Sequence, residues 1–258
     1  KSPEPYGAVP SEAQVEWQKN EFTMFVHFGP NTFTGAEWGS GQEKAEIFNP
    51  TELDCRQWAS IAKAAGMKGI ILTAKHHDGF CLWPNPVSQH TVAQSPWRDG
   101  KGDVLKELSE ACREYDLEFG IYISPWDRND PHYGTDEYNG VFVKTLEHAL
   151  GSYGRVFEQW FDRACGEGPN GRQQVYDWPL FNSTVLKMQP DMIYTHASKK
   201  KLQFLLTQLR KLEQDFLLNF LKEPLELSIR VVDLLLNKGF VQRTALECVI
   251  ATTAESIS

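Results

Sequence analysis

Strand-like and helix-like segments alternate through the first 196 residues, and this alternation is the feature that most constrains the fold. Segment 68–80, KGIILTAKHHDGF, opens with a continuous apolar run, which is typical of a strand buried on both faces. Strand, helix and strand in succession predict a parallel sheet covered by helices. No glycine-rich phosphate loop follows the first strand-like segment, 21–29. A (β/α)8 barrel is therefore favoured over a dinucleotide-binding fold.

Helix signals separate the expected strands. Asp54 is followed three residues later by Gln57, a capping-box pattern, and Gly66 stops the apolar stripe that begins there. A second amphipathic helix is expected to start from Asp103. Further strands are expected at 119–126, 155–162 and 191–196, and further helices at 136–150 and 180–188.

Polar and aromatic residues stand where these strands end. Alternation along 21–29 places Phe25 and His27 on one face, with His27 at the carboxyl end. An aspartate in such a place often only caps a helix or forms a turn, but in a parallel barrel the carboxyl ends of all strands build the active site. The residues expected to meet there are His27, His76, His77, Ser124, Trp126 and Asp162.

This set of residue types suits the cleavage of a sugar. Histidines can hydrogen-bond to hydroxyl groups, and one carboxylate can act as a nucleophile. Tryptophan rings can stack on the apolar face of a sugar, and the rings considered for this are Trp38, Trp83 and Trp126.

Metal-assisted hydrolysis is the competing chemistry. In that case His27, His76 and Asp162 would bind zinc or another divalent ion. Neighbouring residues on a strand point to opposite sides unless the chain bends, so joint binding of one ion by His76 and His77 is the less natural arrangement. No CxxC pair occurs among the five cysteines to suggest a structural zinc site.

Composition narrows the class of protein. The 258 residues, 41% of them hydrophobic, can bury a core of one domain or slightly more. A net charge of −8 disfavours nucleic acid as a partner, and no apolar run is long enough to span a membrane. No signal peptide is visible, and the sequence begins at Lys1 without Met, which either a removed leader or a fragment of a longer chain would explain. An extracellular or secretory compartment is expected.

Five strings occur in the order found in one enzyme family: VHFGPNTFTGAEWGSG, FNPTELDCRQW, AKHHDGFCLWP, GIYISPWDRN and QWFDRACGEGPNGRQQVYDW. Together they resemble the catalytic barrel of glycoside hydrolase family 29, the α-L-fucosidases. The resemblance covers roughly residues 15–195, and the sequences of these motifs are most similar to those of plant and bacterial members.

The resemblance implies a retaining exo-glycosidase that removes terminal α-linked L-fucose from glycans, without a cofactor or metal. By similarity, Asp162 would be the nucleophile. The fucose hydroxyls would be held by histidines, with further residues at the pocket edge and wall. The substrate-binding residues implied are His27, His76, His77, Glu37, Trp38 and Trp126.

The sequence departs from the family after residue 196. The expected glycine- and tryptophan-rich continuation gives way to a leucine-rich stretch, so we divide the chain into a barrel portion, 1–196, and a divergent helical segment, 197–258. About five of eight barrel strands are present, which predicts an incomplete barrel.

A retaining enzyme also needs a second carboxyl group, and no residue is assigned to it. A catalytically inactive or truncated fucosidase relative that keeps a fucose-binding pocket is therefore the alternative function. The carboxylates considered as substitutes are Glu167, Glu223 and Glu226.

Overall fold

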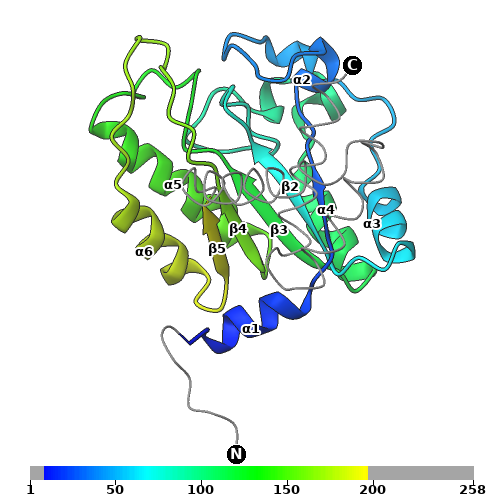
Figure 1. Ribbon diagram of the computed structural model, residues 1–258. Helices are drawn as coiled ribbons and strands as arrows, with labels where there is room; N and C mark the ends of the chain where they lie inside the picture. The colour runs from blue at the N-terminus through cyan, green and yellow to red at the C-terminus, as the bar shows by residue number, and fades with distance from the viewer. Residues whose placement is uncertain (1–8, 197–258) are drawn as a thin grey trace, which may run out of the picture. The chain divides into compact units, whose positions relative to one another are not determined.

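Five parallel strands form one sheet in the order β1-β2-β3-β4-β5 (Figure 1). The computed structural model describes residues 9–196. By its contacts the chain divides into two units, 1–196 and 197–258, and the helices expected in the leucine-rich segment lie outside the described residues. The strands are β1 Thr23–Val26, β2 Gly69–Lys75, β3 Glu118–Ile123, β4 Glu158–Phe161 and β5 Ile193–His196.

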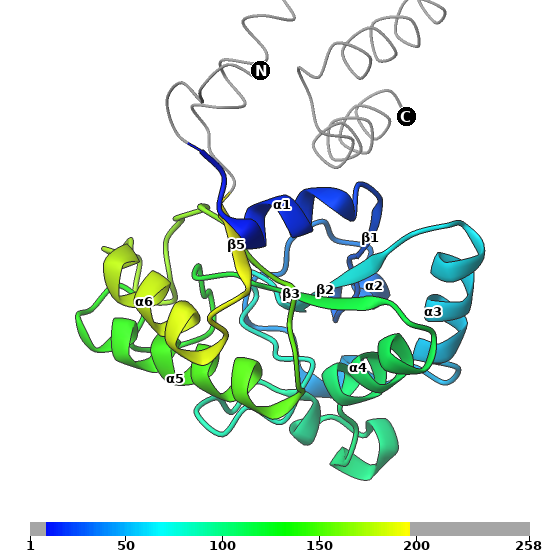
Figure 2. The same ribbon diagram turned by 90° about the horizontal axis from the view of Figure 1, so that it is seen from below.

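Most helices cover one face of this sheet. In Figure 2, α3, α4, α5 and α6 lie on one side of the strands and α1 lies on the other. Short 3-10 helices occupy the connections around β2. The helices are α1 Glu12–Lys19, α2 Asn31–Thr34, α3 Cys55–Ala64, α4 Val104–Glu114, α5 Glu137–Ser152 and α6 Trp178–Met188, with η1 Ala45–Ile47, η2 Val92–Gln94 and η3 Trp97–Gly100.

Aspartate side chains start the helices that follow the strands. Asp54 accepts hydrogen bonds from the backbone N–H groups of Arg56 and Gln57 at 2.9 and 3.3 Å, and so satisfies donors that have no partner within α3. Asp103 caps α4 in the same way. Helix α6 starts two residues earlier than the apolar pattern predicts, because Asp177 caps it and a proline fits its first turn.

Two apolar clusters hold the layers together. The larger lies between the sheet and the helices and includes Ile70, Leu72 and Ile121. The smaller contains Ile71, Tyr122 and Phe157, with Trp17 of α1 packed against it. All seven residues of β2 are buried, which confirms the reading of this segment as a strand covered on both faces.

Helix α1 is fixed to the sheet by a buried carboxylate. Trp17 donates its indole N–H to Glu158 at 2.7 Å, and the hydroxyl of Thr195 donates to the other oxygen of Glu158 at 2.7 Å. Burial raises the pKa of Glu158, although these two hydrogen bonds lower it. Through these hydrogen bonds, Glu158 of β4 links Trp17 of α1 to Thr195 of β5.

The prediction of a parallel α/β sheet is confirmed, whereas closure into a barrel is not seen within residues 9–196. Strands β1 and β5 are the edges of the observed sheet.

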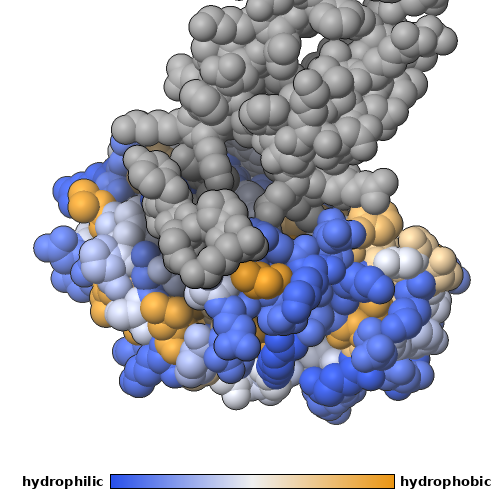
Figure 3. All heavy atoms as spheres, turned by 60° about the horizontal axis from the view of Figure 1, so that its bottom comes forward, coloured by the Kyte–Doolittle hydropathy of each residue, from blue (hydrophilic) through white to orange (hydrophobic). Residues whose placement is uncertain are grey.

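The face of the molecule seen in Figure 3 is mainly hydrophilic, with hydrophobic residues in small separate areas. Among the described helices, none has the length and apolar character needed to cross a membrane.

Candidate active site

A row of nearly parallel aromatic rings runs from the sheet to its carboxyl edge. Each neighbouring pair has ring centroids 4.1–5.8 Å apart, with interplanar angles between 26° and 36°. Packing on both faces restricts the ring orientations of the histidines in the row. The rings, in order, are Trp160, Tyr122, His76, His77 and Trp126.

The rings of the two neighbouring histidines lie side by side. Strand β2 ends at Lys75, and its register with β3 shifts between Thr73 and Lys75. His76 and His77 therefore follow an irregular strand end, where the alternation of a regular strand no longer applies. Their ring centroids are 4.1 Å apart, which is the exception expected from the sequence for a chain that bends.

His27 joins this pair from β1. Its ring lies edge-on to His76, with centroids 4.6 Å apart, and the residue is exposed. The buried Nδ1 of His76 has no hydrogen-bond partner among residues 9–196, which leaves Nε2 as the nitrogen able to meet a ligand. Three imidazoles from two strands thus line one edge of the site.

Asp162 follows β4 and is held by two hydrogen bonds. Its Oδ1 accepts the backbone N–H of Ala164 at 2.8 Å, and its Oδ2 accepts the hydroxyl of Tyr122 at 3.0 Å. The same Oδ2 lies 3.7 Å from Nε2 of His77. The carboxylate is 24% exposed, so it is anchored yet open to a ligand.

Ser124 connects His77 to the segment that follows β3. Its hydroxyl oxygen lies 2.7 Å from Nδ1 of His77 and accepts the backbone N–H of Trp126 at 3.1 Å. Beneath it, Lys75 donates to the carbonyl of Ser124 at 2.9 Å and pairs with Asp127 at 2.9 Å. The side chains of Lys75 and Asp127 are only 4% and 7% exposed. A buried ion pair therefore supports this side of the site.

Two tryptophans border the histidines. Trp126 is 9% exposed, and its indole N–H donates to the carbonyl of Glu167 at 3.1 Å. Trp38 is 54% exposed and lies edge-on to His77 and Trp126, at 6.1 and 6.2 Å between centroids. Glu37, next to Trp38 in the chain, is exposed and makes no hydrogen bond or ion pair within the part of the chain that the structure describes.

Burial determines the charge of the two central histidines. It lowers the pKa of His77 to about 4, although the charge of Asp162 raises it. Burial, and then the neighbouring His77, lower the pKa of His76 to about 2. Both rings are therefore neutral near pH 7. Burial also raises the pKa of the Tyr122 hydroxyl, so this group remains a hydrogen-bond donor to Asp162.

The structure corrects the interpretation of Trp83 as a sugar-stacking ring. Trp83 is fully buried, and its indole N–H donates to His148 at 3.1 Å. Its position in the core leaves no face for a ligand. Among residues 9–196, no three His, Cys, Asp or Glu side chains form a group that could hold a metal ion, so the geometry gives the zinc hypothesis no support.

Four further residues have structural roles. Trp97 lies in the larger core cluster and Trp58 packs against it. Asp78 accepts the backbone N–H of Phe80 at 2.8 Å, and Asp127 accepts two backbone N–H groups of the turn that follows it. These contacts shape the turns that follow β2 and β3.

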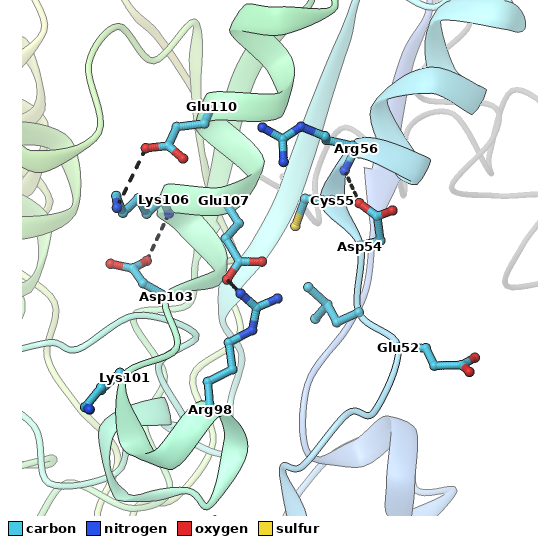
Figure 4. A pocket seen from close by; sticks show the side chains of 11 residues that line it. Glu52, Asp54, Cys55, Arg56, Arg98, Lys101, Asp103, Lys106, Glu107 and Glu110 are labelled. Atoms are coloured by element: carbon cyan, nitrogen blue, oxygen red, sulfur yellow. Dashed lines mark hydrogen bonds and ion pairs between the residues drawn. The ribbon is translucent and has the colours of Figure 1, made fainter.

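A hollow of about 640 Å³ lies away from the histidines, between the starts of α3 and α4. Figure 4 shows charged side chains from both elements around it. Arg98 pairs with Glu107 at 2.8 Å and Lys106 with Glu110 at 3.8 Å. Because these charges balance one another, we assign the hollow no function.

Tyr122 is the residue of this site that the sequence did not reveal. It lies within β3, one residue before the strand end at Ile123, whereas the residues considered from the sequence lie at or beyond the strand ends. A usable signal was the spacing of two residues between Tyr122 and Ser124, which places both on one face of a strand. The hydroxyl contact with Asp162 spans 40 positions of the chain and depends on the neighbouring strand.

Comparison with known proteins gives a consistent result. A family model described as alpha-L-fucosidase matches residues 8–202. Alpha-L-fucosidase 1 of Arabidopsis thaliana is 44% identical over 192 residues, covering 74% of this chain and 38% of the relative. The tissue alpha-L-fucosidase of Homo sapiens is 38% identical over 113 residues, covering 43% of this chain and 22% of that protein.

Solved structures show the same similarity. A glycoside hydrolase 29 family member from an unknown rumen bacterium is 45% identical, with a TM-score of 0.71, covering 76% of this chain and 38% of that one. A Ruminococcus gnavus fucosidase of the same family, in complex with fucose, is 34% identical with a TM-score of 0.66, covering 73% of this chain and 42% of that one. The chain thus spans less than half the length of these relatives.

Proposed function

The chain belongs to the α-L-fucosidase family, and on this premise we propose that it hydrolyses terminal α-linked L-fucose with retention of configuration. The observation that carries the proposal is the meeting of Asp162 with His76 and His77 at one edge of the sheet, bordered by Trp126. A retaining glycosidase needs a carboxylate nucleophile, and neutral hydrogen-bonding rings and an aromatic wall suit the binding of a sugar beside it.

The proposed reaction begins at Asp162. Its carboxylate oxygen attacks the anomeric carbon, the bond from that carbon to the leaving oxygen breaks, and the leaving oxygen takes a proton. Water then hydrolyses the glycosyl ester and restores the carboxylate. The histidines hold the sugar hydroxyls while charge develops on the ring, and their hydrogen bonds strengthen in the transition state.

The group that supplies the proton is left unassigned. Glu167 is exposed in the loop after β4, and its backbone carbonyl already accepts the indole N–H of Trp126. Glu223 and Glu226 lie outside the described residues. Glu37 is exposed next to Trp38 and stays a predicted contact at the pocket edge.

We also infer that the sheet is the first part of a (β/α)8 barrel. Sequential parallel strands with α3–α6 on one face support this inference, as does the likeness to family structures. The substrates expected are fucosylated glycans or oligosaccharides, and the location outside the cell or in the secretory pathway stays a prediction.

The deciding experiment measures hydrolysis of aryl α-L-fucosides with good and poor leaving groups by the full chain and by Asp162→Ala. We expect turnover that Asp162→Ala lowers by at least about 10³-fold. Turnover of the activated substrate only would mean that the nucleophile acts without an acid, because a good leaving group needs little protonation. Fucose binding without any turnover would overturn the proposal in favour of a binding relative.

A further inference from the structure

The hydroxyl of Ser124 makes three hydrogen-bond contacts, with His77 and Trp126, and also interacts with the hydroxyl of Tyr122, whose own proton goes to Asp162. The Ser124 hydroxyl oxygen lies 2.7 Å from Nδ1 of His77, 3.1 Å from the backbone nitrogen of Trp126 and 3.0 Å from the carbonyl oxygen of Trp126. The serine is fully buried, so these groups satisfy the hydroxyl in place of water.

The number of donors and acceptors fixes where the protons lie. A serine hydroxyl has one proton to donate and two lone pairs to accept with. The backbone nitrogen of Trp126 can only donate, and its carbonyl can only accept. The hydroxyl proton therefore goes to the carbonyl, one lone pair accepts the Trp126 N–H, and the second lone pair faces His77. Nδ1 of His77 must then carry a hydrogen.

The reverse arrangement leaves a contact unexplained. If Ser124 donated to His77, the carbonyl of Trp126 would face the hydroxyl oxygen at 3.0 Å without a proton between them. The contact of Nε2, on the other side of the His77 ring, agrees with the arrangement in which Nδ1 carries the hydrogen. Nε2 of His77 stays 3.7 Å from Asp162, longer than an ordinary hydrogen bond, as two acceptor atoms would.

We propose that Ser124 is a positioning residue that holds neutral His77 with its hydrogen on Nδ1, so that Nε2 accepts a hydrogen bond from a substrate hydroxyl. The identity of that hydroxyl as one of fucose rests on the proposed function. Nε2 of His77 and Oδ2 of Asp162 are then two hydrogen-bond acceptors 3.7 Å apart. This pair favours a ligand with free hydroxyl groups over one whose oxygens carry no hydrogen to donate.

Nitrogen NMR of the histidine rings tests the assignment directly. The full chain, labelled with ¹⁵N, is measured at pH 7, and the signals of His77 are identified by their loss in His77→Gln. We expect the pattern of an imidazole protonated at Nδ1. In Ser124→Ala the hydrogen should move to Nε2, because the Nδ1 acceptor is gone and the carboxylate of Asp162 faces Nε2.

A matched control removes a different buried hydroxyl. Ser109, on α4, is 1% exposed and donates to the carbonyl of Lys106 at 2.9 Å. Ser109→Ala should leave the signals of His77 unchanged. A wild-type His77 protonated at Nε2, or a Ser124→Ala protein with the wild-type pattern, would overturn the proposal.

Fucose affinity separates this inference from the proposed function. Where the wild type binds fucose, Ser124→Ala should bind about 5- to 10-fold more weakly, the loss expected for one hydrogen bond, and Ser109→Ala should bind normally. Equal affinity of Ser124→Ala and wild type would contradict the positioning role. A wild type that does not bind fucose would contradict the proposed function instead, and the ring signals would still decide the protonation of His77.

Discussion

The hydroxyl of Tyr122 donates a hydrogen bond of 3.0 Å to the same oxygen of Asp162 that lies 3.7 Å from His77. Tyrosine and aspartate come from adjacent parallel strands, whose register pairs Tyr122 with Trp160, two residues before Asp162. Parallel pairing therefore places a buried donor against the proposed nucleophile.

Removing this donor should reduce catalysis more than stability. Tyr122→Phe deletes a hydrogen bond to a charged group, worth about 1.5–3 kcal/mol, so kcat/KM on an aryl α-L-fucoside should fall roughly 10- to 100-fold. Tyr153→Phe is the control, because Tyr153 donates to Asp103 at 2.9 Å away from the histidines. Similar activity losses in both variants would show that the effect is only structural.

The burial of His77 makes stability depend on pH. Its pKa is about 4 in the folded chain, mainly because of burial, and about 6.5 in an unfolded one. Between these values the unfolded chain binds a proton that the folded chain does not, so the free energy of unfolding falls as pH falls. The contribution lost from about pH 6.5 to about pH 4 is on the order of 3 kcal/mol.

Urea unfolding of wild type and His77→Gln at several pH values isolates this contribution. The stability difference, wild type minus variant, should shrink as pH falls from about 6.5 to about 4 and then level off. A comparison of variants is needed because Asp78 acts in the opposite sense. Burial raises its pKa to about 6, so its contribution to stability grows as pH falls. A difference that does not vary with pH would contradict the prediction.

The buried pair of Lys75 and Asp127 should be essential to the fold around the site. Lys75→Met leaves the charge of Asp127 buried without its partner, which should lower the free energy of unfolding by about 3–5 kcal/mol. Lys106→Met breaks an exposed pair with Glu110 and should cost less than about 1 kcal/mol. Equal losses in chemical denaturation would show that burial of the pair is unimportant.

Gly166 leaves the space that Trp126 occupies. A Cβ atom at Gly166 would lie 2.1 Å from the nearest indole carbon of Trp126, so Gly166→Ala should displace the ring and destabilise the chain by about 1–3 kcal/mol. Fucose binding, measured by titration, should weaken because the Trp126 ring, which forms the wall of the site, is displaced. Gly140→Ala on α5 meets no atom within 4 Å and should be neutral or stabilising. Unchanged fucose binding in Gly166→Ala would argue against a wall at Trp126.

Local sequence patterns were sufficient for the order of the five strands and of helices α3 to α6, but not for α1, α2 and the 3-10 helices. The apolar run of 69–75 predicted a buried strand, and Asp54 and Asp103 predicted the starts of two helices. Both kinds of signal act over a few neighbouring residues, because side-chain alternation and capping are set by the local backbone. They also placed His27, His76 and Asp162 after strands, where parallel pairing brings strand ends together.

Tertiary structure decided what those residues can do. The irregular end of β2 brought the rings of His76 and His77 side by side, and pairing of β3 with β4 brought Tyr122 to Asp162. Trp83, a plausible sugar-binding ring by composition, went into the core instead. The sequence by itself determined which residues follow each strand. The directions of their side chains and their hydrogen-bond partners depended on contacts between strands and loops many residues apart, which no local periodicity encodes.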